Sequence, residues 1–527
     1  MRQRGLSPCL IQMKEFRGNK MAIHTFAAID VGSFEMGLKI FELSKGRPIR
    51  QIDHLERSID LGTDTYTSGK ISYHHVFQVG QVLKEFRTVM DTYRVEDYKA
   101  YGTSAIREMN NASLILDQWE QISGIHIDVI SNSEQRFLDY KSVAFRGEAF
   151  NRMISDTCAI VDIGGGSIQI SLFDEDSLIS TQNLELGVLR LNEQISHIDA
   201  RTSQIDSLVE EMVNAQLETF ANLYLDKKKI HNIIVVDDYI SAVMASRQQE
   251  FVEASVLNKL VKEAREVGPR AVGARLGVTD AALPLLYITG VLMRCIIKTF
   301  NADLIWAPGV KLCDGIAYEY AEKKKILPPS HNFESDIIAC AHNISKRYMG
   351  SEERGTTLEQ IAMNIFDSTK KLHGLTKRER LLLRLSAILH DCGKYISMVN
   401  LAECSYNIIM STEIIGLSHI EREIVANVVK FNHEDFVYYE EQQNVSDLDR
   451  TSYMTIAKLT AILRLANGLD RSHKRKFGDI RITLKNDKMV VSARTGVDVT
   501  LEKSLFQARA DFFEEVFGVR PVIKQSR

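Results

Sequence analysis

Two stretches with the same pattern decide the fold: TFAAIDVGSFEMGLKIFEL at residues 25–43 and CAIVDIGGGSIQISLFD at residues 158–174. Each begins as an apolar β-type run that ends in an aspartate, Asp30 or Asp162. Each then passes through a Gly/Ser turn into a second run of alternating character. Strand, turn and strand in this order predict a β-hairpin. Dinucleotide-binding and mononucleotide-binding loops differ, because their glycines open a helix.

The glycine turns of these hairpins are suited to binding anions. Glycine permits close approach between backbone and ligand, and consecutive N–H groups in such a turn can surround an anion. Two facing hairpins would hold a chain of phosphates from both sides, with Asp30 and Asp162 placed to hold or orient a divalent cation. The alternative is a pair of ordinary hairpins whose aspartates accept hydrogen bonds from their own turns. Repetition of the pattern favours the binding interpretation.

Length and charge exclude several classes of protein. A chain of 527 residues is too long for one ordinary core and predicts three or four domains. Its 65 basic and 69 acidic residues give a net charge of −4, which argues against a protein that coats DNA or an anionic membrane. No window approaches the roughly 18 uncharged apolar residues that span a bilayer. We therefore expect neither a DNA partner nor a membrane partner.

The cysteines and the amino-terminal segment indicate a cytoplasmic protein. The seven cysteines are scattered, their number is odd and none forms a Cys-x-x-Cys pair, so a disulfide framework is not expected. Residues 1–20 are basic but lack the apolar core and cleavage site of a secretory signal. We interpret them as a disordered tail or an over-long start, with Met21 as the alternative first residue.

Changes in periodicity divide the rest of the chain. Helical periodicity runs through 202–230 and 252–300 and is interrupted by the strand-like IIVV at 233–236. KKKILPPS at 323–330 combines basic residues with prolines, which is typical of an interdomain linker. An almost wholly helical stretch follows this linker.

The carboxyl-terminal end returns to mixed character. RITLKNDKMVVSAR at 481–494 predicts a two-stranded hairpin that turns at Asn486-Asp487, and LEKSLFQARADFFEEVFG at 501–518 predicts an amphipathic helix closed by Gly518. We therefore predict a tail over 1–20, α/β lobes over 21–148 and 149–322, an all-α domain over 323–477 and a small α+β module over 478–527.

Five segments together resemble the exopolyphosphatase and guanosine pentaphosphate phosphatase (Ppx/GppA) family of the actin-like ATPase superfamily. They are AIDVGS at 28–33, TSAIRE at 103–108, SNSEQ at 131–135, VDIGGGS at 161–167 and LELGVLRL at 184–191. The resemblance implies two actin-like (RNase H-like, ASKHA) lobes around a cleft. In that cleft a Mg²⁺-dependent hydrolase would remove terminal phosphates from inorganic polyphosphate or guanosine pentaphosphate. It also implies a homodimer.

The resemblance assigns roles to particular residues. Hydrolysis of a phosphoanhydride requires charge neutralisation at the transferred phosphoryl group and an oriented water. Arg107 would add a charged contact, with its first-turn, solvated position as the alternative. Asp162, and with it Asp30, would hold Mg²⁺. The phosphate cradle would consist of Gly32, Ser33, Thr103, Ser104, Gly164, Gly165, Gly166 and Ser167.

Glu134 has two interpretations. Ser131-x-x-Glu134 follows a predicted strand and precedes a predicted helix, which is the spacing of a capping box. Spacing alone favours the cap. The resemblance reverses that order, because the family has its catalytic carboxylate at this junction, so Glu134 is predicted to activate the attacking water. Ser104 has a similar alternative as a plain helix N-cap.

Three departures from the family pattern bear on activity. Phe34-Glu35 replaces Asn-Ser in the first turn, and Ile168-Gln169 replaces Thr-Glu in the second. The family's third glycine-rich phosphate loop is replaced by Asp237-Asp238, whose charges would repel a polyanion. Either the substrate is shorter than usual, or these aspartates bind a cation, or phosphate binding has been lost.

The helical stretch resembles the metal-dependent phosphohydrolase (HD) domain of long family members. LSAILHDCGKYIS at 385–397 and LTAILRLANGLDRSH at 459–473 carry this resemblance, with His390, Asp391 and Asp470 as the remaining metal-site residues. Thr357 occupies the place of the earlier histidine. We therefore expect a structural His-Asp-Asp network rather than a working metal site.

The first functional hypothesis is an exopolyphosphatase-type hydrolase, favoured by Glu134 and Asp162. The alternative is a catalytically weak polyphosphate or nucleotide sensor, favoured by Gln169 and Asp237-Asp238. A sugar or acetate kinase of the same superfamily is less well supported, because the sequence has no recognisable adenosine-binding glycine loop.

Overall fold

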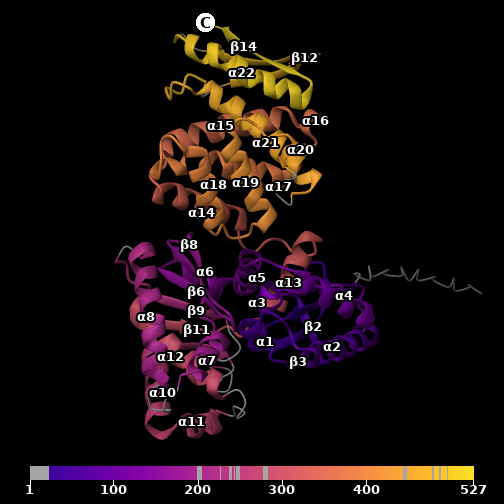
Figure 1. Ribbon diagram of the computed structural model, residues 1–527, viewed down its shortest axis with the longest axis vertical. Coiled ribbons are helices and arrows are strands. Elements are labelled where there is room, and N and C mark those ends of the chain that lie inside the picture. The colour runs from indigo at the N-terminus through magenta and orange to yellow at the C-terminus, as the bar shows by residue number, and fades with distance from the viewer. Residues whose placement is uncertain are drawn as a thin grey trace, which may run out of the picture.

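The computed structural model describes residues 23–198, 205–225, 227–236, 240–241, 244, 250–276, 283–442, 448–477, 480–485, 488–494 and 497–526. The expected tail over 1–20, the Asp237-Asp238 pair and the Asn486-Asp487 turn lie outside these residues. Two α/β lobes lie side by side, a helical domain covers one end of both, and a small carboxyl-terminal module lies beyond it (Figure 1).

The first lobe is built on a five-stranded sheet of order β3-β2-β1-β4-β5. β1 (Ile23–Val31), β2 (Glu35–Ser44) and β3 (Arg50–Ser58) are antiparallel, whereas β4 (Asp97–Gly102) and β5 (Asp128–Val129) continue the sheet in parallel. Alternate residues of β1 point to opposite faces, so Ala27 and Ile29 enter one core cluster and Phe26 and Ala28 enter another. Both faces of the sheet are therefore covered.

The helices of this lobe follow the strands in chain order. They are α1 (Leu61–Ser68), α2 (Tyr73–Thr92), α3 (Ser104–Glu108), α4 (Ala112–Ser123), α5 (Asn132–Ala144) and α6 (Glu148–Ile154). Buried side chains of α2 and α4 join the core cluster on one face of the sheet, among them Val79, Leu83 and Trp119. Leu138 of α5 belongs to the cluster on the other face.

The second lobe repeats the arrangement on a six-stranded sheet of order β10-β11-β9-β6-β7-β8. β6 (Cys158–Ile163) and β7 (Ile168–Asp174) form an antiparallel hairpin that β8 (Ser177–Leu184) extends, and β9 (Asn232–Val236) lies parallel to β6. β11 (Leu304–Trp306) and β10 (Phe251–Glu253) complete the sheet. Both predicted hairpins are confirmed, and each lies beside a parallel strand.

The helices of the second part of the chain include one very apolar member. They are α7 (Val188–Ser196), α8 (Ile205–Tyr224), α10 (Ala254–Val267), α11 (Pro269–Leu276) and α12 (Leu283–Phe300). By length and composition α12 alone among the described helices could cross a membrane, but two thirds of it is buried inside the fold. It packs against α8 and carries Arg294 and Lys298, so its place is that of a core helix.

The helix α13 (Leu312–Lys323) belongs with the first lobe by its contacts. The predicted boundary at 322 assigns this segment to the second lobe, whereas α13 packs on β1, β2 and α5. Tyr320 stacks on Phe26 with ring centroids 4.0 Å apart. Gly315 lies so close to α5 that a Cβ atom there would collide with the carbonyl of Leu138. The chain therefore returns to the first lobe after completing the second.

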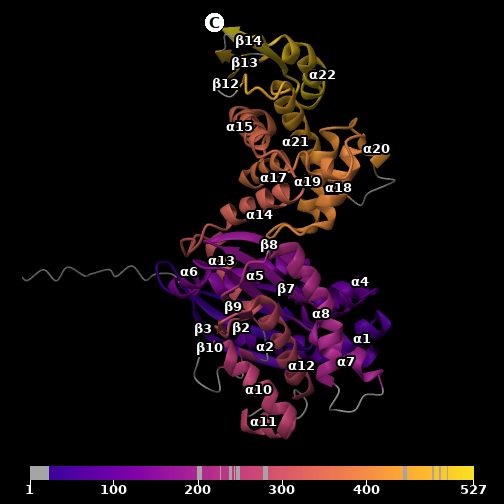
Figure 2. The same cartoon turned by 90° about the vertical axis from the view of Figure 1, so that its left-hand side faces the viewer.

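The rest of the chain forms a helical domain and a small module. The domain comprises α14 (Phe333–Arg347), α15 (Glu352–Ser368), α16 (Lys370–His373), α17 (Lys377–Ile388), the 3₁₀ turn Cys392–Tyr395, α18 (Leu401–Ser411), α19 (His419–Phe431), α20 (Tyr439–Gln442) and α21 (Arg450–Leu469). α14 packs on β8, which joins this domain to the second lobe (Figure 2).

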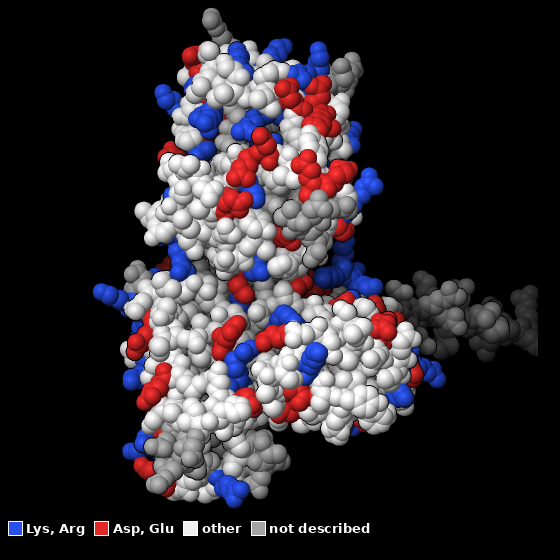
Figure 3. All heavy atoms as spheres, viewed as in Figure 1, with Lys and Arg blue, Asp and Glu red and all other residues white. Residues whose placement is uncertain are grey.

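In the carboxyl-terminal module, β12 (Ile480–Lys485) and β13 (Lys488–Arg494) form the predicted hairpin. α22 (Thr500–Phe517) ends at Gly518 in the left-handed conformation, as predicted, and leads into β14 (Arg520–Ser526). Acidic and basic side chains are interspersed over the visible face of the molecule (Figure 3), in line with the small net charge.

Gly315→Ala is expected to destabilise the protein by about 1–3 kcal/mol or more, because the added methyl group has only backbone to displace. A matched control is Gly355→Ala in α15, where the nearest atom to a new Cβ lies 4.0 Å away. That substitution is expected to raise stability by up to ~1 kcal/mol through helix propensity. Thermal and denaturant unfolding measure both effects. Equal midpoints for the two variants would contradict the close α5–α13 approach.

Candidate functional site

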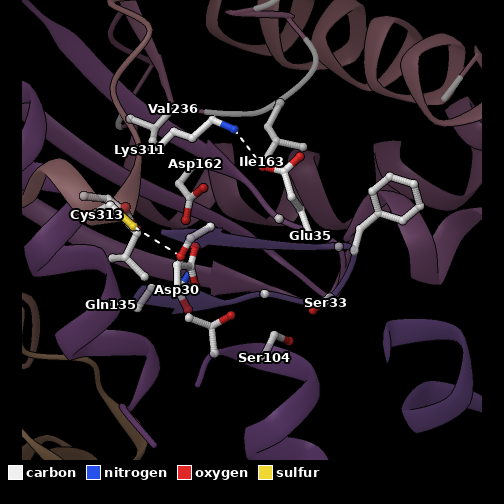
Figure 4. A pocket seen from close by; sticks show the side chains of 18 of the residues that line it. Asp30, Ser33, Glu35, Ser104, Gln135, Asp162, Ile163, Val236, Lys311 and Cys313 are labelled. Atoms are coloured by element: carbon white, nitrogen blue, oxygen red, sulfur yellow. Dashed lines mark hydrogen bonds and ion pairs between the residues drawn. The ribbon is translucent and has the colours of Figure 1, made fainter. Parts of the chain in front are cut away.

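A pocket lies where the two hairpin turns meet. Figure 4 shows Asp30 and Ser33 from the first hairpin and Asp162 and Ile163 from the second around one space. The amino-terminal end of α3, the first turns of α5 and the segment before α13 complete the wall. Every residue of the predicted phosphate cradle lines this pocket: Gly32, Ser33, Thr103, Ser104, Gly164, Gly165, Gly166 and Ser167. Segments far apart in the sequence therefore form one site.

The two turns are built in the same way. The N–H of Gly32 donates to the carbonyl of Glu35 and the N–H of Gly164 donates to the carbonyl of Ser167, both at 3.0 Å. A Cβ atom at Gly32 would lie 2.8 Å from that Glu35 oxygen. Glycine is required here by the tight turn itself, independently of any ligand.

Tyr66 of α1 links the first turn to α3 and lies against the second turn. Its hydroxyl lies 2.9 Å from the Ser33 hydroxyl and donates to the Ser104 hydroxyl, also at 2.9 Å. Burial raises the pKa of Tyr66, so the phenol stays protonated as a donor. A Cβ atom at Gly166 would collide with both the Tyr66 and the Ser104 hydroxyls. The second turn thus depends on glycine to approach the first lobe.

Arg190 of α7 fixes the same contact from the second lobe. Its Nε donates to the carbonyl of Gly166 at 3.0 Å, its guanidinium pairs with Glu108 at 2.8 Å, and it lies over the Tyr66 ring. Thr103 occupies the N-cap position of α3 without a side-chain capping bond. The alternative role of Ser104 as a plain N-cap is therefore wrong, because Ser104 is the first residue of the helix.

The charge in this pocket is mainly negative. Its lining carboxylates are Asp30, Glu35, Asp139 and Asp162, and its lining lysines are Lys39 and Lys311. Both lysines already have carboxylate partners. Lys39 pairs with Asp314 at 2.8 Å, and Lys311 pairs with Glu35 at 2.8 Å and with Glu56. A phosphate chain entering this pocket would require a cation.

Asp30 and Asp162 bring carboxylates into the pocket from the two strand ends. Each is the penultimate residue of its strand, β1 or β6, and Figure 4 shows both turned toward the middle of the pocket. On the outer side, hydrogen bonds from His54 and Lys311 lower the pKa of Glu56 to about 2. The Lys311 charge is therefore neutralised over the whole physiological pH range.

Glu134 does not line this pocket. It forms the capping box of α5: its Oε2 accepts from the Ser131 N–H at 3.0 Å and from the Ser131 hydroxyl at 2.8 Å, while the Ser131 hydroxyl accepts from the Glu134 N–H. Its side chain faces the groove between α5 and the helical domain. The predicted capping box is thus formed, and the role of Glu134 as the base stays a prediction.

Gln135 and Asp139 face the pocket instead. They lie four residues apart on α5, hence one above the other on the same face. Asp139 is buried, and the buried Oε1 of Gln135 has no hydrogen-bond partner among the described residues. The sequence analysis missed both. The signal was available, because a helix whose third residue caps its own end must direct its fourth residue elsewhere.

Arg107 also lies outside the pocket. Its guanidinium donates to the carbonyl of Ile130 at 2.5 Å and to the side chain of Asn132, in the groove that Glu134 faces. Burial lowers the pKa of Arg107 from its usual value. The guanidinium anchors the strand end before α5, and Arg107 is not among the residues that line the pocket.

Two family models match the chain. The model for the Ppx/GppA phosphatase family matches residues 40–233, and the model for Ppx/GppA phosphatase, domain III, matches residues 338–508. Together these ranges cover more than half of the chain.

The chain belongs to the Ppx/GppA phosphatase family.

Relatives and solved structures agree with this membership. Guanosine-5'-triphosphate,3'-diphosphate pyrophosphatases of Photobacterium profundum and Aliivibrio fischeri are 20% and 21% identical, covering 83% and 89% of this chain and 86% and 91% of theirs. An exopolyphosphatase from Cytophaga hutchinsonii superposes with a TM-score of 0.51 at 18% identity, over 57% of this chain and 99% of its own. An Aquifex aeolicus family member gives 0.49 at 22% identity, over 57% and 99%. The superposition on the exopolyphosphatase agrees with the actin-like α/β fold of the two lobes, and the helical part that follows them is the one described above.

The predicted metal residues of the helical domain do not fit a metal site. The described residues contain no group of three or more His, Cys, Asp or Glu side chains arranged to hold an ion. His390 is fully buried, its Nδ1 donates to the Ala387 carbonyl at 2.8 Å, and its Nε2 lies 3.8 Å from Asp391. Asp391 pairs with Lys394 at 3.1 Å.

Asp470 and Thr357, the other residues of the predicted metal site, also have protein partners. Asp470 accepts the N–H of Arg475, and burial raises the pKa of its carboxyl group. The Arg354 guanidinium acts electrostatically on both Asp391 and Asp470. Thr357 donates its hydroxyl to the Glu353 carbonyl. Arg354 therefore contributes positive charge near both carboxylates. The identity of this region as an HD domain stays a prediction.

Glu134→Ala should destabilise this protein by about 0.5–2 kcal/mol, because the substitution removes one half of the capping box of α5. The control is Glu148→Ala in α6, whose side chain is 92% exposed and which is expected to change stability by less than ~0.5 kcal/mol. Denaturant unfolding followed by circular dichroism measures the difference. No difference between the variants would mean that the cap is not formed in solution.

Proposed function

We propose that this protein is a phosphoanhydride hydrolase that releases terminal phosphate from inorganic polyphosphate or guanosine pentaphosphate. The observation that carries the proposal is the meeting of two equivalent glycine turns at one pocket, with Asp30 and Asp162 at its sides. The names of relatives support it, since they are called exopolyphosphatase and guanosine-5'-triphosphate,3'-diphosphate pyrophosphatase.

Mg²⁺ is the proposed cofactor. Asp30 and Asp162 would hold it, because Mg²⁺ prefers oxygen ligands and is commonly bound by one or two carboxylates together with substrate phosphates. When bound, it would neutralise charge on the phosphates. The acidic lining of the pocket supports this assignment, since both lining lysines are already paired with carboxylates.

Asp139 is the proposed general base in place of Glu134. It is the carboxylate that α5 presents to the pocket, one turn after Gln135. In the reaction, a water oxygen attacks the terminal phosphorus and its proton passes to the Asp139 carboxylate. The bridging P–O bond then breaks, and its electron pair stays on the leaving phosphate chain. Backbone N–H groups of the glycine turns stabilise the transferred phosphoryl group.

A second candidate is a sensor that binds the phosphate chain without hydrolysing it. The observation that favours it is the pair of amides in the pocket, Gln135 and Gln169, which cannot accept a proton from water at neutral pH. The homodimer and the cytoplasmic location stay predictions.

Asp139→Asn is expected to lower phosphate release by roughly 10²–10⁴-fold, because it removes one positioned base. Glu134→Gln serves as the control, and its release is expected to stay within a few-fold of the natural protein. Release from long-chain polyphosphate and from guanosine pentaphosphate is measured separately, which identifies the substrate. Loss of release in Glu134→Gln with full release in Asp139→Asn would contradict the assignment of the base. Tight binding without release by the natural protein would favour the sensor.

Removal of Mg²⁺ by a chelator should abolish release and weaken binding, because the pocket would then offer unneutralised carboxylates to a polyanion. Asp162→Asn is expected to raise the Mg²⁺ concentration required for half-maximal release by about ten-fold or more. The measurement is a Mg²⁺ titration at fixed substrate. Full release in excess chelator would contradict a metal role for Asp30 and Asp162.

A further inference from the structure

Gln169 lies in the pocket opposite Asp162. The two residues are paired across β6 and β7, and Gln169 is 3% exposed. It departs from the carboxylate that the family pattern has at this position. Its side chain contacts Arg136 of α5, which is also 3% exposed.

The contact with Arg136 decides how the amide of Gln169 is oriented. The Arg136 Nε donates to Oε1 of Gln169 at 3.0 Å. A guanidinium group has donors and no acceptor, so the atom of Gln169 that faces it must be the oxygen. The amide nitrogen is consequently directed away from Arg136. Among the described residues Nε2 of Gln169 has no hydrogen-bond acceptor, although the residue lines the pocket.

An amide donor that opens into the pocket and has no acceptor there among the described residues is suited to a ligand oxygen. Phosphate oxygens are acceptors, and hydrogen bonds to charged oxygens are the stronger kind. A glutamate at this position would offer only acceptors to the same space. The difference from the family pattern thus replaces a carboxylate with a neutral amide that carries a donor.

Arg136 is held in place by residues outside the pocket. Its guanidinium pairs with Glu413 at 2.8 Å and donates to the hydroxyl of Thr181 on β8. Glu413 belongs to the segment that joins α18 to α19 in the helical domain. The same segment accepts a second buried bond from α5, because Ser133 donates to the Ile414 carbonyl at 2.6 Å. The helical domain therefore supports the first turn of α5 directly behind the pocket.

We propose that Arg136 is a positioning residue that turns the amide of Gln169 toward the bound phosphate chain, and that Glu413 of the helical domain keeps Arg136 in that position. The proposal rests on the proposed function, since it concerns the ligand of the same pocket. It makes Gln169 a direct phosphate contact that needs no cation between them. It also makes the affinity of the pocket depend on a residue of the helical domain.

The test compares ligand binding by the full-length natural protein with that of Gln169→Leu and Gln169→Glu, using polyphosphate of defined length and a Mg²⁺ titration. Gln169→Leu is expected to raise Kd by roughly ten- to a hundred-fold, the range for one hydrogen bond to a charged group. Gln169→Glu is expected to lose at least as much at low Mg²⁺ and to regain affinity as Mg²⁺ rises. A merely structural role would not produce this dependence on Mg²⁺.

The positioning role of Arg136 is tested by combining its substitution with that of Gln169 in a double-mutant cycle. Arg136→Met should weaken binding in the same direction as Gln169→Leu, and the double variant should be no weaker than the worse single variant, because both remove one interaction. Arg136→Lys should restore part of the affinity, since it returns a donor. Arg152→Met, an exposed substitution on α6, is the matched control. In turnover, these variants are expected to have a higher KM than the natural protein, whereas their kcat stays within about three-fold of its value. This is the pattern for a contact that is made equally in the ground state and the transition state.

Each outcome decides between the proposals. Natural protein that binds while Gln169→Leu binds equally well overturns the role of Gln169 and leaves the proposed function standing. Additive effects of Arg136→Met and Gln169→Leu overturn the positioning role of Arg136. Natural protein that binds no phosphate chain overturns the proposed function and this inference together. Where Arg136→Met does not fold, the two Gln169 variants decide the question, because they leave the Arg136–Glu413 pair intact.

Discussion

Close backbone approach between two glycine turns is the constraint on which the site depends. Gly165 and Gly166 of the second lobe can lie against Ser33, Tyr66 and Ser104 of the first only because they lack side chains. Arg190 of the second lobe then joins the two lobes through its ion pair with Glu108 and its contact with the Tyr66 ring. Since the turns end strands of two separate sheets, their contact also fixes how the lobes are placed. The strand ends that carry Asp30 and Asp162 face each other as a result.

Electrostatics determine what this arrangement can bind. The strand ends bring carboxylates into the pocket, and the lysines that enter it are neutralised by Asp314, Glu35 and Glu56. In the proposed function, such a pocket therefore takes anions together with a cation. The amide of Gln169, oriented by Arg136, adds one neutral donor that does not disturb this balance. In the proposed function, recognition of phosphate thus relies on oriented dipoles more than on net positive charge.

The sequence was sufficient to predict the elements that depend on local patterns. The hairpins around Asp30 and Asp162 follow from apolar runs that end in a glycine turn, and the cradle residues line one pocket as expected. The family motif does not predict which residue of α5 faces the pocket, because Glu134 and Gln135 are adjacent and point in directions about 100° apart on a helix. The capping box settles which of them turns away. Partners distant in sequence, such as Arg136 with Glu413, leave no local signal.

The position of α13 has a consequence for how the molecule moves and how it can be divided. The chain crosses from the first lobe to the second before β6 and crosses back before α13, so two covalent connections join the lobes. Relative motion of the two lobes then requires both connections to bend together, which is a hinge motion. The first lobe is also discontinuous: a fragment that stops before Leu312 would leave the apolar side chains of Phe26, Ala28 and Phe41 without their cover. Two connections between the lobes and a discontinuous first lobe are therefore two results of one returning helix.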